Sequence, residues 1–296
     1  MNRMHRSRSI TEQLYPRWLL IPVLVFYVVF FILPVLGGFY ISFTNWDITK
    51  IGYRFVGFRN YANILKNSTF RKAALNTLTF LVSIVIGRNV IAILLALGLT
   101  KSLKTRTYLR TMFYLPAVLS YVVVGIMFNA LFQMDGTINQ ILNGIGIFCK
   151  KEWVASADTA LMTVIIEDIW KWTGFHMIIY IAGLTAIPHE FYEASRIDGA
   201  SSWKQFWTIT LPLLVPALTI NVTQAIIGGF RVFEQVLTLT GGGPGHESTV
   251  VGMLIYENFC NGFYGKASAM TMLLSAVVLV VTIGVRSYFS SKVVNY

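Results

Sequence analysis

Ionisable side chains stand inside two long apolar segments of the chain. Arg88 lies in one of them, and Glu167, Asp168 and Lys171 lie in another. A charged side chain at the centre of a bilayer costs about 2.5–3.5 kcal/mol on insertion scales unless it faces protein or water. Because Lys171 follows Glu167 by four residues and Asp168 by three, we expect an ion pair within one helix. Two interpretations stay open: a structural pair that fixes helix packing, or a polar cavity on a transport path.

Aromatic and amide side chains accompany these charges. A sugar stacks its apolar face on aromatic rings while its hydroxyls form hydrogen bonds, but such rings also serve as packing or as an interfacial belt. Asn221, Gln224 and Gly228 share one helical face, where they either hold helices together or line a cavity. His176 predicts no metal site, because no second ligand stands at a suitable spacing. The candidate cavity residues are Arg88, Glu167, Trp170, Lys171, Trp172, Asn221 and Gln224.

The composition predicts that membrane-spanning helices hold these residues. Hydrophobic residues make up 55% of the chain and charged residues 12%, with a mean hydropathy of +0.62, which exceeds what a soluble domain can bury. A span needs about 20 mostly apolar residues, and continuous apolar runs disfavour a β-barrel. We expect an all-α membrane protein with a cytoplasmic N-terminal segment at 1–18 and one six-helix domain at 19–296. Its spans are expected at 19–43, 77–99, 111–133, 159–187, 211–230 and 267–287.

Basic residues orient these spans. The basic N-terminus and the compact 101–110 loop favour cytoplasmic N- and C-termini under the positive-inside rule, whereas the basic 44–76 loop opposes them. The net charge of +11 is spread over loops that flank the spans, which favours contact with membrane lipid over nucleic acid. On this topology Cys149 and Cys260 lie outside, and a disulfide between them stays open.

A polar segment between the fourth and fifth predicted spans has the pattern of a helical hairpin. Pro188 ends the fourth span, and a short helix can follow over residues 190–198. Gly199 then stands where a helix end favours a left-handed residue. Ser202 and Gln205 fit a capping box that begins a second short helix. The hairpin either lies on lipid headgroups or docks on a soluble partner.

The same segment resembles the EAA signature of permease subunits of binding-protein-dependent ABC importers. Ser195 stands where the family usually has alanine. The likeness rests on Glu193, Ala194, Ser195, Gly199, Ile209, Leu211 and Pro212. Four further segments resemble the carbohydrate class of these permeases, which is of the maltose, glycerol-phosphate or multiple-sugar type. They are residues 55–61, 76–77, 239–244 and 264–267.

This resemblance implies a type I ABC importer permease fold with cytoplasmic coupling helices. Residues 189–210 would form the coupling loop, which lies in a groove of a separate ATPase subunit. Glu193 would supply an ionic contact to the ATPase, Ala194 would permit close approach, and Gly199 would form the bend. The exit into the fifth span would be set by Ile209, Leu211 and Pro212.

The resemblance also implies partners. They would be a second, similar permease subunit that completes a heterodimer, two ATPase subunits that bind ATP-Mg, and an extracytoplasmic solute-binding protein. The loop that carries Gly242, Gly243 and Pro244 would approach this solute-binding protein. On composition alone, this loop is a flexible connector.

The chain itself has no recognisable ATP site and no cofactor motif. The segment 265–268 resembles a phosphate-binding loop, but Cys260 replaces the upstream glycine and Ala267 follows the lysine. We therefore expect a non-enzymatic subunit of an importer that moves a sugar or oligosaccharide through a bacterial or archaeal plasma membrane. A sugar-phosphate or polyol importer is the alternative. A secondary transporter would show internal repeats, and an intramembrane enzyme would show a motif such as HExxH or GxSxG; neither is present.

Overall fold

The computed structural model of the protein describes residues 18, 20–100, 104–148 and 150–291. Of the predicted N-terminal segment, residues 1–17 lie outside this part. Cys149 also lies outside it, so the disulfide question is not decided; Cys260 is an exposed free thiol.

Within the described residues the secondary structure is helical, apart from an isolated antiparallel bridge between Thr44 and Phe55. The first half contains α2 (Leu20–Tyr27), the π-helical turn η2 (Val28–Ile32), α3 (Leu33–Ser42), α4 (Arg59–Lys66), α5 (Ser68–Thr100), α6 (Arg106–Val118), α7 (Tyr121–Phe132) and α8 (Thr137–Gly144). The second half contains α9 (Ala160–Ala186), α10 (His189–Ile197), α11 (Ser202–Gln205), η3 (Phe206–Thr210), α12 (Leu211–Leu213), α13 (Val215–Phe230), α14 (Glu234–Leu239), α15 (Val251–Cys260) and α16 (Tyr264–Ser290).

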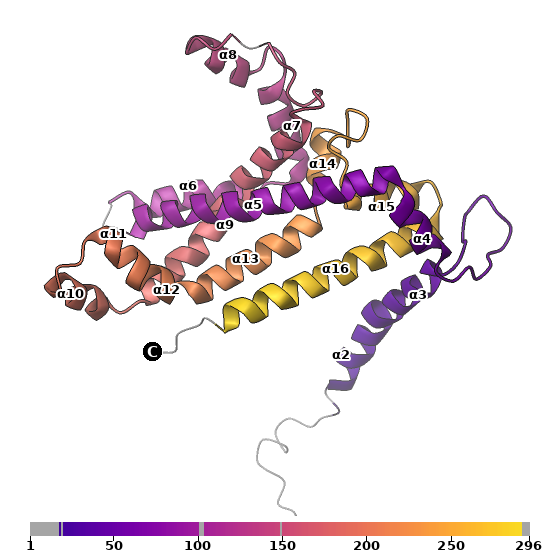
Figure 1. Ribbon diagram of the computed structural model, residues 1–296, viewed down its shortest axis with the longest axis horizontal. Helices are drawn as coiled ribbons and strands as arrows, with labels where there is room; N and C mark the ends of the chain where they lie inside the picture. Colours follow the sequence, from indigo (N-terminus) through magenta and orange to yellow (C-terminus); the bar gives the residue numbers. More distant parts are fainter. Residues whose placement is uncertain (1–17, 19, 101–103, 149, 292–296) are drawn as a thin grey trace, which may run out of the picture.

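The long helices α5, α9, α13 and α16 form the body of the bundle (Figure 1). α5 makes its most extensive contact with α9, and α13 packs on α5 and α16. Glycines permit close approach to α9: a Cβ on Gly174 would lie 1.9 Å from the carbonyl oxygen of Phe113 on α6, and one on Gly87 would lie 2.4 Å from Ile169. α9 is therefore the central helix against which the site is assembled.

The structure corrects the third predicted span. Residues 111–133 do not form one helix, because Leu119 and Ser120 are extended and separate α6 from α7. Pro116 lies in the last turn of α6, where it has no N–H to donate to the preceding turn. Ser120 then begins α7, since its Oγ accepts a hydrogen bond from the Val123 N–H at 3.4 Å.

The number of spans is only partly settled by the helix lengths. Among the described residues, four helices are long and apolar enough to cross a membrane: Leu20–Ser42, Ser68–Thr100, Tyr121–Gly144 and Tyr264–Phe289. A pair bent by 68°, Ser202–Leu213 and Val215–Phe230, makes a fifth if it counts as one span. α9 has 27 residues but is less apolar, since Glu167, Asp168 and Lys171 lie within it. The six-span count therefore stays a prediction.

Segments assigned to one side by the sequence lie at one end of the bundle. Helices α10 to α12, the C-terminal end of α5, the start of α6 and the C-terminal end of α16 lie toward the left in Figure 1. α4, α14 and α15 lie at the opposite end.

Candidate functional site

A cavity of about 660 Å³ lies within the bundle, lined by residues of α5, α7, α9, α13 and α14. Its walls combine aromatic rings, amides and guanidinium groups. They are contributed by Arg88, Tyr121, Trp172, Phe175, His176, Gln224, Ile227, Gly228, Arg231, Phe233, Glu234 and Gln235. A cavity of this volume and chemistry suits a small polar molecule with apolar faces.

A buried ion pair stands at this cavity. The Arg88 Nε donates a hydrogen bond to Asp168 Oδ1 at 2.8 Å, and Arg88 Nη2 donates to the same oxygen. The Gln235 amide donates to the second Asp168 oxygen, Oδ2, at 3.0 Å. Asp168 therefore joins three helices, α5, α9 and α14. The Arg88 guanidinium also lies 5.8 Å from the centroid of the Trp172 ring.

The predicted ion pair within α9 is wrong. Lys171 pairs with neither Glu167 nor Asp168, because its ammonium donates instead to the backbone carbonyls of Pro116, at 3.2 Å, and Leu119. Asp168 is already held by Arg88. Glu167 is fully buried, and neither of its carboxylate oxygens has a hydrogen-bond partner among the described residues.

The structure separates the seven candidate cavity residues. Arg88, Trp172 and Gln224 line the cavity. Asn221 is buried between helices: its Oδ1 lies 2.9 Å from His176 Nδ1, and its amide donates to the His176 carbonyl at 3.1 Å. Trp170 contacts Phe128 in a tilted arrangement, with ring centroids 5.3 Å apart. Glu167, Lys171, Trp170 and Asn221 are thus not among the lining residues.

Several lining residues have no counterpart in the sequence prediction. These residues lie at two helix breaks, 119–120 and 231–233: Tyr121 begins α7 after the first, and Arg231, Phe233, Glu234 and Gln235 lie in the second or in the first turn of α14 that follows it. Charged residues directly after the apolar 211–230 segment were a usable signal for the second group. No sequence signal marks Tyr121 as a lining residue, because its position depends on the break before α7, which the sequence does not predict.

The segment between α9 and α13 forms the expected helical hairpin. The predicted helix over 190–198 is α10, and Gly199 has the left-handed φ of +74°. The Gly199 N–H donates to the Arg196 carbonyl at 3.0 Å and the Ala200 N–H donates to the Ser195 carbonyl at 2.9 Å. These two bonds are a Schellman motif, which ends α10 sharply.

The predicted capping box is wrong in its register. Ser201 caps α11: it is extended, and its Oγ accepts from the Lys204 N–H at 3.3 Å, whereas Ser202 is already helical. The Gln205 amide donates to Ser195 Oγ at 3.0 Å instead of reaching back to a cap. Ser195, at the position where the signature usually has alanine, therefore links α10 to α11.

The remaining residues of the signature lie on both helices of the hairpin. Glu193 and Ala194 are exposed on α10, and Ile209, Leu211 and Pro212 are half-buried in η3 and α12. The Tyr192 hydroxyl lies 3.0 Å from Thr210 Oγ1, which fixes the first helix against the return segment. The hairpin thus presents an acidic and a small residue to solvent on a braced support.

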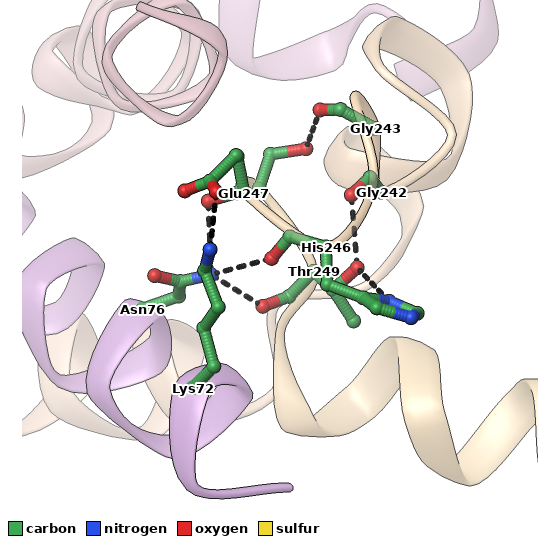
Figure 2. A network of polar contacts seen from close by, with 8 residues as sticks. Lys72, Asn76, Gly242, Gly243, His246, Glu247 and Thr249 are labelled. Atoms are coloured by element: carbon green, nitrogen blue, oxygen red, sulfur yellow. Dashed lines mark hydrogen bonds and ion pairs between the residues drawn. The ribbon is translucent and has the colours of Figure 1, made fainter. Parts of the chain in front are cut away.

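The glycine-rich loop at the opposite end is held to α5 (Figure 2). The Asn76 amide donates to the backbone carbonyls of His246, Glu247 and Thr249, at 3.2, 2.9 and 2.9 Å. Lys72 forms an ion pair with Glu247. Within the loop, Thr249 Oγ1 donates to the Gly242 carbonyl at 2.8 Å and Ser248 Oγ donates to the Gly243 carbonyl at 2.7 Å. Hydrogen bonds therefore fix the base of the part of the loop that carries Gly242, Gly243 and Pro244.

Helices that enclose a polar cavity inside an apolar bundle, with a braced hairpin at one end, define a membrane transport component. Residues 88–294 match the family described as the binding-protein-dependent transport system inner membrane component, and the chain belongs to this family. In the described part, no group of three His, Cys, Asp or Glu side chains could hold a metal ion.

Relatives and solved structures agree with this family. The chain is 33% identical over 268 residues to the multiple sugar-binding transport system permease protein MsmF of Streptococcus mutans, covering 90% of this chain and 91% of that protein. It is 35% identical over 267 residues to the trehalose/maltose transport system permease protein MalF of Thermococcus litoralis, covering 90% of each. A chain of a bacterial ABC transporter that imports the acidic polysaccharide alginate superposes with a TM-score of 0.82 at 25% identity, covering 95% of this chain and 96% of that one. The resemblance to carbohydrate-class ABC permeases is confirmed.

Proposed function

We propose that this chain is the transmembrane subunit of an ATP-driven importer that carries a sugar or oligosaccharide into the cytoplasm. The observation that carries the proposal is the cavity, in which Tyr121, Trp172 and Phe233 offer ring faces and Gln224 and Gln235 offer amides. This combination recognises a sugar, which has an apolar face and a periphery of hydroxyls. Relatives named for multiple sugars, trehalose or maltose, and lactose support the same cargo class.

Energy for import would enter through the hairpin 189–212. Exposed Glu193 would pair with a basic residue in a groove of the ATPase subunit, and Ala194 would allow the two surfaces to approach. The Schellman bend at Gly199 and the Ser195–Gln205 hydrogen bond would make the hairpin stiff enough to move α12 and α13 when the ATPase dimer closes. The sequence offers no ATP site in this chain, so two ATPase subunits with ATP-Mg would be required.

At the other end, the tied glycine loop would meet the solute-binding protein. A structure similar to this chain, with a TM-score of 0.78 at 26% identity, is of an alginate transporter in complex with an alginate pentasaccharide-bound periplasmic protein. A second permease subunit would complete the transport path as a heterodimer. Both termini would face the cytoplasm.

Reconstitution tests this function. The chain is purified with the second permease and the ATPase subunits of its own organism, placed in proteoliposomes with ATP inside, and supplied with the solute-binding protein outside. Radiolabelled maltose, trehalose and lactose are the neutral probes. We expect one of them to accumulate only when ATP is hydrolysed. Failure of any ATPase subunit to co-purify, or accumulation that an ion gradient drives without ATP, would contradict the proposal.

A second cargo class follows from Arg231. Its exposed guanidinium lines the cavity beside Glu234, and a guanidinium is well suited to bind phosphate. Glycerol phosphate is therefore included as an anionic probe in the same uptake assay. Preferential uptake of glycerol phosphate would assign the sugar-phosphate or polyol alternative, whereas preference for a neutral sugar supports the main proposal.

Trp172→Ala should raise the half-saturation concentration for uptake by roughly tenfold, equivalent to about 1.4 kcal/mol of lost binding. The reason is that Trp172 provides a ring face on the cavity wall. Trp170→Ala is the matched control, because this ring lies two residues away on α9 but packs on Phe128 and is not among the residues that line the cavity. Equal effects of the two substitutions on half-saturation would argue against a sugar that stacks on Trp172.

A further inference from the structure

The break between α6 and α7 leaves backbone carbonyls that need donors. The last carbonyls of an α-helix have no partner within the helix. At the end of α6 the Leu119 N–H donates a hydrogen bond to the Pro116 carbonyl at 3.2 Å. The chain then passes through two extended residues, Leu119 and Ser120, into α7. Unsatisfied carbonyls at such a break are costly inside a membrane, where no water replaces the lost bonds.

The Lys171 side chain of α9 supplies these donors. Its ammonium donates to the carbonyls of Pro116, at 3.2 Å, and Leu119, so it binds the C-terminal end of α6, where the helix dipole favours a cation. The side chain is 2% exposed. Gly174, one turn further along α9, brings α6 close enough for this contact, since a Cβ there would lie 1.9 Å from the Phe113 carbonyl oxygen.

The same ammonium is close to a ring of the cavity wall. Lys171 Nζ lies 4.7 Å from the centroid of the Tyr121 ring, a cation–π distance, and Tyr121 is the first residue of α7. The Tyr121 hydroxyl accepts a hydrogen bond from Trp172 Nε1 at 2.8 Å. Tyr121 and Trp172 both line the cavity, whereas Lys171 does not.

We propose that Lys171 is a positioning residue for transport. Its ammonium binds the backbone carbonyls at the α6–α7 break and so holds Tyr121 in the cavity wall, together with Trp172, which is hydrogen-bonded to Tyr121. Lys171 touches no cargo. The inference rests on the proposed function, which assigns cargo binding to this cavity. It gives a role to a buried lysine whose ammonium binds two backbone carbonyls.

Uptake kinetics of the reconstituted complex test this role. The probe is maltose, trehalose or lactose, whichever the wild-type complex imports fastest. Lys171→Met keeps the length and apolar stem but removes the ammonium, and we expect an assembled complex whose half-saturation concentration rises about tenfold, with a smaller change in maximal rate. Lys171→Arg keeps the donors, and its half-saturation should stay close to the wild-type value.

A double-mutant cycle separates positioning from mere stability. If Lys171 acts through Tyr121, Lys171→Met should add little to the defect of Tyr121→Ala, because the ring that it positions is already gone. The fold effects of Lys171→Met and Gln224→Ala on the half-saturation concentration should multiply, since Gln224 lines the cavity from α13 and not from the helices that flank the break. Multiplicative effects of Lys171→Met and Tyr121→Ala would overturn the inference.

The remaining outcomes also decide the matter. If the Lys171→Met complex does not assemble, the double-mutant cycle is run with Lys171→Gln, whose amide can donate one of the two hydrogen bonds. Failure of both variants to assemble would assign Lys171 a purely structural role and overturn the inference. A wild-type complex that imports none of the sugars would refute the proposed function. Wild-type import with unchanged kinetics in Lys171→Met would refute only the positioning role.

Discussion

Asp168→Asn should destabilise the permease by about 3–5 kcal/mol, because it leaves the buried Arg88 guanidinium without its counter-charge. Asp168 is fully buried and holds Arg88 of α5 and Gln235 of α14 at once. The loss is measured as a fall in the midpoint of thermal unfolding of the purified complex in lipid nanodiscs. We also expect ATP-dependent uptake to fall with it, since Arg88 and Gln235 both line the cavity.

Glu167→Gln is the matched control for this prediction. It makes the same chemical change at the adjacent position of α9, at a side chain that is equally buried. Because neither Glu167 carboxyl oxygen has a hydrogen-bond partner among the described residues, the substitution breaks no such bond, and the unfolding midpoint should not fall. Equal losses from both substitutions would show that burial of a carboxyl on α9, and not the pair with Arg88, sets the stability.

Gly199→Val should uncouple ATP hydrolysis from import while the protein still inserts into the membrane. A left-handed residue with a side chain costs roughly 1–2 kcal/mol, and a β-branched one is a clear outlier there. A cost of about 1–2 kcal/mol lowers the ratio of correctly bent to other hairpin conformations roughly 5- to 30-fold. Coupled uptake should fall with the population of the bent conformation. The measurement is the ratio of sugar imported to ATP hydrolysed in proteoliposomes.

Gly52→Val controls for the backbone strain alone. Gly52 has a φ of +80°, and a Cβ there, as at Gly199, would meet nothing within 4 Å. It lies in the loop before α4, far along the chain from the hairpin. We expect Gly52→Val to leave the transport ratio near its wild-type value. Wild-type coupling in Gly199→Val would remove the bend from the mechanism, as would equal uncoupling by both variants.

Local patterns were predicted well because short-range sterics decide them. Pro188 ends α9, the helix over 190–198 is found as His189–Ile197, and only a glycine suits the φ of +74° at position 199. The cap at Ser202 was misplaced by one residue, since Ser201 and Ser202 are both good caps and only the backbone conformation distinguishes them. Helix ends are therefore predictable to within about one or two residues.

The pairing of charges could not be predicted from spacing. Lys171 stands at the right interval from Glu167 and Asp168, yet its ammonium binds the α6 carbonyls, because a helix break that was not foreseen leaves acceptors there. Arg88 lies 80 positions before Asp168 in the sequence, so their contact exists only after α5 packs on α9.

Composition and local patterns are enough to predict a helical membrane protein, a hairpin with a glycine bend after the fourth predicted span, and the family that the chain resembles. These properties depend on composition and on residues close together in the chain, where hydrophobicity and backbone sterics act directly. Three features follow only from tertiary packing: which polar residues share the cavity, the contact of Asp168 with three helices, and the binding of Lys171 to the end of α6. Such contacts depend on which helix faces meet, and that is set by packing of residues far apart in sequence, including the close approaches at Gly87 and Gly174.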